Sequence, residues 1–255
     1  MPAAQLLDDL GAPVPVSGPI RRVISLVPSL TESMATSRPE LLVGCTDWCT
    51  HPAGLDLPRL RGTKNPDLAR IIDLRPDLVI CNQEENRQLD VQRLRAAGVT
   101  VWVSRIETLD EAFGSLARLF TQVLDGPEPD WLARARAIWA APEPLRRRRV
   151  AVAIWRDPWM VVGTPTFTAD LLARLGADNA FATGPDRYPT VTPAEILAAE
   201  PELILLPDEP YRFSAEDGPE AFDGHPTALL SGRLLTWYGP SLVAARAELA
   251  AVLGL

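Results

Sequence analysis

The chain alternates short, continuous apolar runs with segments whose apolar residues recur at helical spacing. The apolar runs lie at residues 22–27, 41–45, 77–81 and 99–104 in the first half, and at 150–155, 160–162, 203–206 and 234–237 in the second. Runs of this length without polar alternation are typical of strands buried on both faces of a parallel sheet. We therefore predict two sets of buried strands.

Signals for helix starts fall between these runs. The spacing of a capping box occurs three times, in Ser29 with Glu32, Thr108 with Glu111, and Thr192 with Glu195. Asn65 followed by Pro66 also predicts a helix start, with the asparagine as N-cap. The other expected helices cover residues 88–97, 168–175 and 242–253. Strands that alternate with helices indicate βαβ units.

The two halves are joined by a segment that is itself helical in pattern. One helical face carries Trp131, Leu132, Ala135, Ile138 and Trp139. Pro142 and Pro144 must interrupt that helix. We predict an α/β fold of two lobes, each with a central, mostly parallel sheet flanked by helices, joined by a helical backbone. The N-terminal lobe is residues 1–106, the helical connector 107–149, and the C-terminal lobe 150–255. The arginine run at 146–149 is interpreted as complementing a helix end rather than binding phosphate.

Charge and hydropathy narrow the classes of function. The 255 residues include 33 acidic and 25 basic side chains, a net charge of −8, which argues against nucleic-acid binding. No apolar run reaches the roughly 18 residues expected of a membrane span. The first 20 residues lack the basic and apolar regions of a secretory signal. We therefore expect a soluble, cytoplasmic and monomeric protein.

Motifs for familiar chemistry are missing from the sequence. It holds no glycine-rich nucleotide loop and no Gly-x-Ser-x-Gly elbow, and its only histidines are His51 and His225. Cys45, Cys49 and His51 are close in sequence and could be soft metal ligands. Their spacing matches no structural zinc pattern, so we expect a buried thiol and a loop thiol instead. No intrinsic cofactor, metal site or catalytic residue is predicted.

Polar and aromatic residues gather where the predicted strands end. In parallel sheets, ligands bind beyond the carboxyl ends of the strands. These positions hold Ser29, Trp48, Asn82 to Asn86 and Arg105 in the first lobe, and Trp155, Arg156, Trp159, Asp208, Glu209, Tyr211, Trp237 and Tyr238 in the second. Exposed aromatic rings among a few polar groups suit a large, flat, partly apolar ligand.

The order of several motifs resembles that of a known family. Residues 22–32 (RVISLVPSLTE), 44–48 (GCTDW), 62–66 (GTKNP) and 74–80 (LRPDLVI) are similar to those of class III, helical-backbone solute-binding proteins. The resemblance is nearest to the vitamin B12-binding branch, whose relatives bind haem or ferric siderophores. It implies two α/β lobes joined by a rigid helix, with the ligand in a shallow cleft between them. By position, it places Trp48 and residues 62–65 at the corrin, together with Trp155, Trp159 and Trp237.

The resemblance also implies docking on a membrane transporter through one glutamate on each lobe. The matching positions are Ala69 and Ala194. Glu195 is one residue away and would point about 100° round the helix. This departure argues against docking on an ABC transporter, as the missing signal argues against export.

The leading hypothesis is binding of a corrinoid or related metal chelate in the cleft, without chemistry. The predicted ligand-binding residues are Ser29, Trp48, Thr63, Lys64, Asn65, Asn82, Glu84, Trp155, Arg156, Trp159, Tyr211 and Trp237.

Three alternatives remain open from the residues. A ferric siderophore would use the cations Lys64, Arg105, Arg156 and Arg212. Haem would take an axial ligand from Tyr188, Tyr211, Tyr238 or His51. A protein that binds either ligand could serve an ABC importer if the true start of the chain lies upstream, and it would then be in the periplasm or at the cell surface. A corrinoid- or chelate-processing enzyme on the same fold would use the carboxylates Glu84, Glu85, Asp208 and Glu209.

Overall fold

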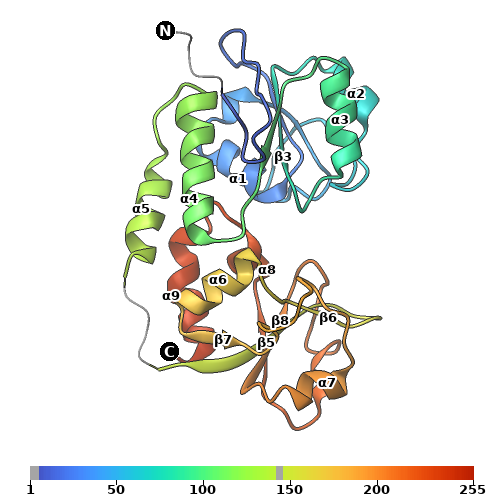
Figure 1. Cartoon of the computed structure of the whole chain (residues 1–255), viewed down its shortest axis with the longest axis vertical. Helices are drawn as coiled ribbons and strands as arrows, with labels where there is room; N and C mark the ends of the chain where they lie inside the picture. Colours follow the sequence, from blue (N-terminus) through green and yellow to red (C-terminus); the bar gives the residue numbers. More distant parts are fainter. Residues whose placement is uncertain (1–5, 142–145) are drawn as a thin grey trace. The chain divides into compact units, whose positions relative to one another are not determined.

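The computed structural model describes residues 6–141 and 146–255, which form two compact units. Unit 1 comprises the described residues up to Ile106, with Asp110–Ala133 and Tyr238–Pro240. Unit 2 comprises Glu107–Leu109, the described residues from Arg134 to Trp237, and Ser241–Leu255. The predicted two-lobed α/β fold is confirmed (Figure 1). The predicted break at Pro142 and Pro144 lies outside the described residues.

Unit 1 is built on a parallel sheet with the strand order β2-β1-β3-β4. Its strands are β1 (Val23–Ser25), β2 (Leu42–Cys45), β3 (Leu78–Asn82) and β4 (Val101–Ser104). Neighbours in sequence such as Ile80 and Cys81 are both fully buried, on opposite faces. Both faces are covered by helices, which is why the strands have continuous apolar sequences.

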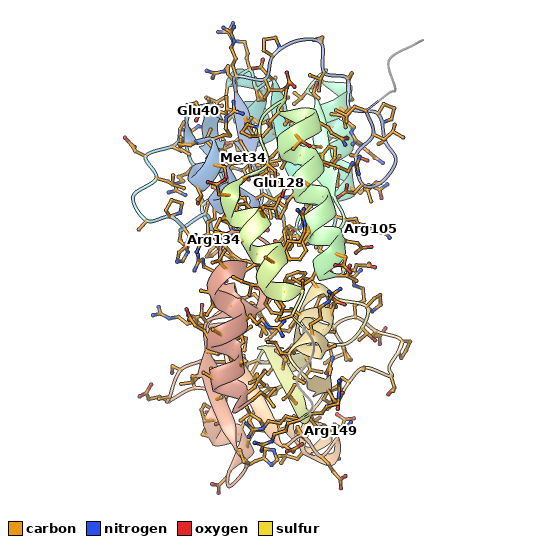
Figure 2. The ribbon with its side chains drawn as sticks, turned by 90° about the vertical axis from the view of Figure 1, so that its left-hand side faces the viewer. Met34, Glu40, Arg105, Glu128, Arg134 and Arg149 are labelled. Atoms are coloured by element: carbon orange, nitrogen blue, oxygen red, sulfur yellow. The ribbon has the colours of Figure 1, made fainter. Side chains whose placement is uncertain are left out.

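The helices of unit 1 lie on both sides of that sheet (Figure 1). They are α1 (Pro28–Ser37), η1 (Pro39–Leu41), α2 (Leu68–Asp73), α3 (Gln88–Ala96), α4 (Leu109–Arg118, whose first residue is in unit 2) and the π-helical turn η2 (Leu119–Val123). The core under α2 and α3 includes Ile71 and Leu94 packed on strand residues such as Ile24 and Val79. Figure 2 labels Met34, which is buried on α1.

Two predicted helix starts in unit 1 are wrong. Helix α1 begins at Pro28, after Val27, and Ser29 is buried inside its first turn instead of capping it. Helix α2 begins after Asp67, whose carboxylate accepts a hydrogen bond from the Arg70 amide at 3.1 Å. Asp67 takes the capping role predicted for Asn65 because its side chain lies within reach of a first-turn amide.

The predicted apolar face of the connector is confirmed in helix α5 (Asp130–Trp139). Trp131, Leu132, Ala135 and Trp139 are buried and Ile138 is half-buried. The Trp131 indole N–H donates to the Ser37 hydroxyl at 2.8 Å within unit 1. The Trp139 indole N–H donates to the Leu242 carbonyl at 2.9 Å within unit 2. Both indoles therefore anchor the helix by packing and by a hydrogen bond.

Unit 2 has a mixed five-stranded sheet with the path β6-β5-β8-β9. Its strands are β5 (Arg148–Trp155), β6 (Met160–Val161), β7 (Ala177–Asn179), β8 (Leu203–Pro207) and β9 (Thr227–Leu230). β7 pairs in parallel with the first half of β5, and β6 pairs antiparallel with its second half. The helices of this unit are α6 (Phe167–Arg174), α7 (Pro193–Ala198), η3 (Pro219–Phe222), α8 (Gly232–Thr236) and α9 (Leu242–Leu253).

The strand predicted at 234–237 is wrong, because most of this run forms the short helix α8. The Asp208 carboxylate accepts a hydrogen bond from the Gly232 amide at 2.7 Å, which satisfies an amide of the first helical turn. A Cβ at Gly232 would lie 2.6 Å from the Glu209 carbonyl oxygen, so the backbones approach closely there. This contact between distant segments favours a helix over the strand that the local sequence predicts.

Three arginines of the run complement helix ends, on helices other than the connector, and Arg147 pairs with Asp178 of β7. Arg148 donates to the Leu253 carbonyl at 2.7 Å and Arg146 to the Gly254 carbonyl at 3.3 Å, both at the end of α9. Arg149, labelled in Figure 2, donates to the Ala199 carbonyl at 2.9 Å, just after α7. Guanidinium groups at these carbonyls also complement the helix dipoles.

The predicted capping box at Thr192 is confirmed and gives a first test of the fold. The Thr192 hydroxyl accepts from the Glu195 amide at 3.2 Å, and the Glu195 carboxylate accepts from the Thr192 amide at 2.7 Å. We expect Thr192→Ala to lower the free energy of unfolding by about 1 kcal/mol in urea denaturation. Thr192→Ser keeps the hydroxyl and should remain within a few tenths of a kcal/mol of wild type; equal losses for both variants would contradict the cap.

The same box predicts a pH dependence. Hydrogen bonds from the Thr192 backbone amide and hydroxyl lower the pKa of Glu195. A carboxylate whose pKa is lowered by folding stabilises the fold above its unfolded pKa and loses that contribution as the pH falls. The stability difference between wild type and Thr192→Ala should therefore shrink in acid, measured by denaturation below pH 4.5.

Candidate functional site

The carboxyl edge of the unit 1 sheet presents an exposed tryptophan. Trp48 follows β2 and is 67% exposed. A Cβ at Gly62 would lie 3.3 Å from the Trp48 indole nitrogen and 2.5 Å from the Asn65 side-chain oxygen, so both side chains lie directly against the glycine backbone. The Asp47 amide donates to the Arg61 carbonyl at 2.9 Å, which ties the two segments together. We call the exposed indole and residues 62–65 the Trp48 platform.

The side chain of Asn86 holds the turn of the Trp48 platform by hydrogen bonds. The Asn86 side-chain nitrogen Nδ2 donates to the Thr63 backbone carbonyl at 3.0 Å and to the Leu26 backbone carbonyl at 3.1 Å. The Asn86 side-chain oxygen Oδ1 accepts a hydrogen bond from the Asn82 backbone amide at 2.9 Å. Lys64 donates to the Glu84 carbonyl across the same turn. Asn86 was not among the predicted ligand contacts, because its role as a brace depends on residues about 23 and 60 positions away.

Two predicted ligand contacts of unit 1 are buried parts of its framework. Asn82 donates from its side chain to Ser104 and accepts from the Glu84 amide at 2.8 Å, so it shapes the loop after β3. Ser29 is buried in the first turn of α1. The structure therefore leaves Trp48, Thr63, Lys64, Asn65 and Glu84 as the predicted residues of this edge that solvent reaches.

A pair of carboxylates borders the platform. Burial raises the pKa of Glu85 and the neighbouring charge of Glu84 raises it further, whereas the Lys64 ammonium and a hydrogen bond with Thr63 lower it. The sequence indicates Glu85 as a member of a polar run and as a carboxylate of the enzyme alternative, but not as a ligand contact. It lies close to Lys64, the single lysine of the chain.

The charges around Glu85 give a test with two opposite signs. Lys64→Met removes the nearby cation and should raise the pKa of Glu85, and Glu84→Gln removes the like charge and should lower it. The measurement is a pH titration of the Glu85 side-chain carbonyl by carbon-detected NMR. Shifts of the same sign in both variants would contradict this arrangement of charges.

Unit 2 presents an aromatic pair at the carboxyl edge of its own sheet. Trp155 ends β5, is 43% exposed and meets Tyr211 edge to face with 5.6 Å between the ring centroids. The Tyr211 hydroxyl donates to Asp217 at 2.6 Å, which raises the pKa of Tyr211. Arg156 pairs with Asp217 and Glu220. The charge of Arg156, which the sequence predicts as a ligand contact, is therefore neutralised by two carboxylates of unit 2.

The expectation of exposure is wrong for the other two predicted tryptophans. Trp159 and Trp237 are each 7% exposed. Trp159 stacks on Phe213 at 5.6 Å and meets Phe222 edge-on at 5.0 Å, in the core of unit 2. The position of Trp159 after a strand predicts a ligand contact, but the ring is buried against Phe213 and Phe222 instead.

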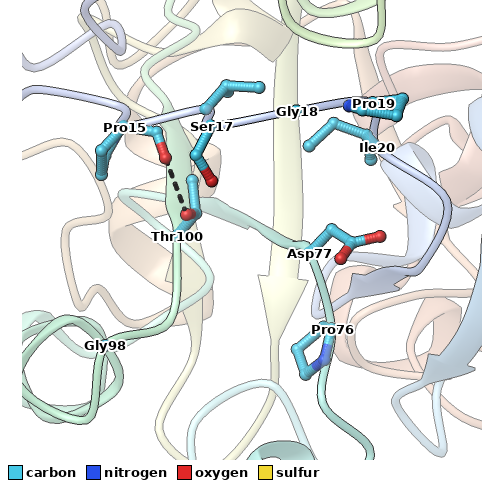
Figure 3. A pocket seen from close by; sticks show the side chains of 10 residues that line it. Pro15, Ser17, Gly18, Pro19, Ile20, Pro76, Asp77, Gly98 and Thr100 are labelled. Atoms are coloured by element: carbon cyan, nitrogen blue, oxygen red, sulfur yellow. Dashed lines mark hydrogen bonds between the residues drawn. The ribbon is translucent and has the colours of Figure 1, made fainter.

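Two hollows of the described surface lie away from these edges. One of about 260 Å³ lies at the amino ends of the unit 1 strands, where the Thr100 hydroxyl donates to the Pro15 carbonyl (Figure 3). The other, of about 360 Å³, lies in unit 2 beside α6 and β7. Neither is lined by a predicted site residue, so neither hollow includes the Trp48 platform.

The soft-metal hypothesis finds no support in the described residues. Cys45 and Cys49 are buried, whereas His51 is exposed, with its Nδ1 3.1 Å from the Thr50 hydroxyl. Across residues 6–141 and 146–255, no three His, Cys, Asp or Glu side chains group as metal ligands would. Over the same residues, no helix combines the length and the apolar character that a membrane crossing needs.

Comparison with known proteins decides the family. The model of the family described as "Periplasmic binding protein" matches residues 23–229, most of the chain. The chain belongs to the periplasmic binding protein family. The resemblance to class III solute-binding proteins is thereby confirmed. A periplasmic family is at odds with the cytoplasmic location expected from the sequence.

Individual relatives agree with this assignment. The vitamin B12-binding protein of Vibrio parahaemolyticus is 26% identical over 196 residues, 73% of this chain and 70% of the relative. Two solved structures share the fold: the periplasmic vitamin B12-binding protein of Vibrio cholerae (TM-score 0.74, 22% identical, 92% of this chain and 97% of that one) and a periplasmic haem-binding protein of Roseiflexus (TM-score 0.77, 23% identical, 92% and 98%).

Proposed function

We propose that this protein binds a corrinoid, or a closely related metal chelate, on the Trp48 platform and releases it unchanged. The observation that carries the proposal is the Trp48 indole, 67% exposed yet fixed against the Gly62 backbone. A rigid exposed ring offers apolar contact at little entropic cost, which suits a large flat ligand. The Trp155–Tyr211 pair is a second surface of the same kind. Relatives named vitamin B12-binding protein support the ligand class.

The polar groups of the platform favour an amide-rich ligand over an anionic one. A ferric siderophore would need uncompensated cations, but Arg156 is paired with two carboxylates, and Lys64 donates to the Glu84 backbone carbonyl and lies close to the Glu85 carboxyl. The side-chain amide of Asn65 and the Thr63 hydroxyl match the amide periphery of a corrin. Of the four candidate haem ligands, Tyr211 donates its hydroxyl to Asp217 and Tyr238 is buried, which leaves Tyr188 and His51 as the exposed ones.

We infer that binding proceeds without catalysis. Of the carboxylates considered for acid–base chemistry, Asp208 caps helix α8 through the Gly232 amide. Burial raises the pKa of Glu85, and the groups around this carboxyl are Lys64, Glu84 and the Thr63 hydroxyl.

We also infer that the protein does not engage an ABC transporter through paired glutamates. Ala69 on α2 and Ala194 on α7 are both exposed at the positions where the resemblance implies glutamates. Glu195 accepts hydrogen bonds from Thr192 in the capping box, so its carboxylate is already engaged. A binding assay with Ala69→Glu and Ala194→Glu combined would show whether docking can be installed.

The function is tested by retention of a coloured ligand through a sizing column. Purified protein is offered aquocobalamin, haemin and a ferric catecholate separately, and the spectrum of the protein peak is recorded. We expect the corrin spectrum near one equivalent and neither of the others. Retention of haemin or the catecholate alone would replace the corrinoid proposal, and retention of none would overturn it.

A further inference from the structure

The sheet of unit 2 ends in a strand whose outer side is open. Strand β9 is the last on the path β6-β5-β8-β9 and pairs in parallel with β8. The Asp208 amide donates to the Leu230 carbonyl at 3.1 Å on the side that faces β8. Because successive residues of a strand direct their backbone groups to opposite sides, Ala228 also faces β8, whereas Thr227 and Leu229 face outward. Within the described residues, no backbone group bonds these outward N–H and C=O groups.

Other edge strands of the described residues are covered by segments of their own chain. Beside β6, the Val161 amide donates to the Pro189 carbonyl at 3.1 Å. Beside β4, the Asp9 amide donates to the Val103 carbonyl at 3.2 Å. Residues 58–60 lie along β2 and bond it in both directions. Strand β9 lacks such a cover.

The open edge is apolar as well as unpaired. Leu229 is 44% exposed, and Thr227, Ala228 and Leu230 are half-buried. Proteins usually protect an exposed strand edge with a charged side chain or a proline within the strand, and residues 227–230 contain neither. This edge therefore offers both backbone hydrogen bonds and apolar contact to another strand.

The sequence around β9 is complementary to itself. Asp223 lies five residues before Ala228 and Arg233 lies five residues after it. A strand edge that pairs with its own copy about a twofold axis runs antiparallel to it. With Ala228 on that axis, Thr227 and Leu229 stand opposite Leu229 and Thr227 of the second copy, and each such pair exchanges both backbone hydrogen bonds. Asp223 of each copy then falls on the side of Arg233 of the other, and opposite charges at both ends favour this register.

We propose that β9 pairs antiparallel with β9 of a second copy of this chain, about a twofold axis at Ala228. The two unit 2 sheets then continue into one another. Two strands of this length bury less than the roughly 1,600 Å² of a standard interface, so the dimer dissociates on dilution. The Trp48 platform belongs to unit 1 and contributes nothing to this contact, so the proposal is independent of the proposed function.

The first test is sedimentation equilibrium of the whole protein without ligand, from micromolar to near-millimolar concentration. The weight-average mass of wild type should rise from one chain toward two. Leu229→Pro removes an N–H that faces outward and leaves the ladder to β8 intact, so it should stay monomeric with an unchanged far-UV circular dichroism spectrum. A wild type that is monomeric throughout, as the sequence leads us to expect, would overturn the proposal. A folded Leu229→Pro that dimerises like wild type would do the same.

A second test reads the register directly. At a non-hydrogen-bonded antiparallel pair the two Cα atoms lie about 4.5 Å apart, which a disulfide can span. Ala228→Cys should therefore form a disulfide-linked dimer under mild oxidation, seen on a non-reducing gel and reversed by dithiothreitol. The three native thiols are buried.

The matched control is Ala194→Cys, which places a thiol at an exposed alanine of α7 in the same unit. At equal concentration it should link far more slowly, through random collisions. Equal rates in the two variants, or no linked dimer of Ala228→Cys, would contradict the pairing at Ala228. Neither test involves the corrinoid, so failure here is distinct from failure of the proposed function.

Discussion

Replacing Trp48 with alanine is expected to weaken corrinoid binding by roughly thirtyfold, or about 2 kcal/mol, as for a central tryptophan of a binding surface. The ring is 67% exposed and lies on the Gly62 backbone, so its removal takes away contact area for the ligand and little from the core. The melting temperature should therefore stay at the wild-type value. The measurement is a spectrophotometric titration with aquocobalamin, paired with thermal unfolding without ligand.

Two control variants show what the loss means. Trp48→Phe keeps an aromatic plane and should recover most of the affinity. Leu89→Ala removes an exposed apolar side chain of α3 that is not one of the platform residues, and it should leave binding unchanged. If Trp48→Ala binds like wild type while Leu89→Ala also does, the platform is not the corrinoid site.

The sheets could be predicted because their strands satisfy a local rule. A strand buried on both faces needs a continuous apolar run, and the runs at β1, β3, β5 and β8 meet that need whatever surrounds them. The run at 234–237 meets it too, yet it folds mostly as helix α8. There the deciding contact comes from Asp208, more than twenty residues away, which no local pattern contains.

The sequence could predict which segments meet at the candidate site, but not which of their side chains are exposed. The carboxyl ends of parallel strands share one edge, which correctly brings together the segments after β2 and β3. Whether a side chain there faces solvent depends on which loop covers it. Asn82 and Trp159 have the right residue type and place, but the first bonds Ser104 and the second lies under Phe213. Sequence places a residue at an edge, and long-range packing decides its exposure.

Trp159→Ala should be the most destabilising of the substitutions considered, lowering the free energy of unfolding by about 3 to 5 kcal/mol. The indole is 7% exposed, is stacked on Phe213, meets Phe222 edge-on and lies 5.4 Å below the Arg156 guanidinium. Its loss leaves a cavity that these rings cannot fill without shifting. Urea denaturation with tryptophan fluorescence measures the change, and Trp159→Phe should lose clearly less.

Trp155→Ala is the matched control four residues away, and the pair separates packing from ligand contact. Trp155 is 43% exposed and rests on one edge of Tyr211, so its loss should cost well under half as much stability. On the proposed function it should instead weaken corrinoid binding, while any folded fraction of Trp159→Ala keeps its affinity. The reverse pattern, with Trp159→Ala stable but unable to bind, would make Trp159 a ligand contact that reaches the surface when the loop above it opens.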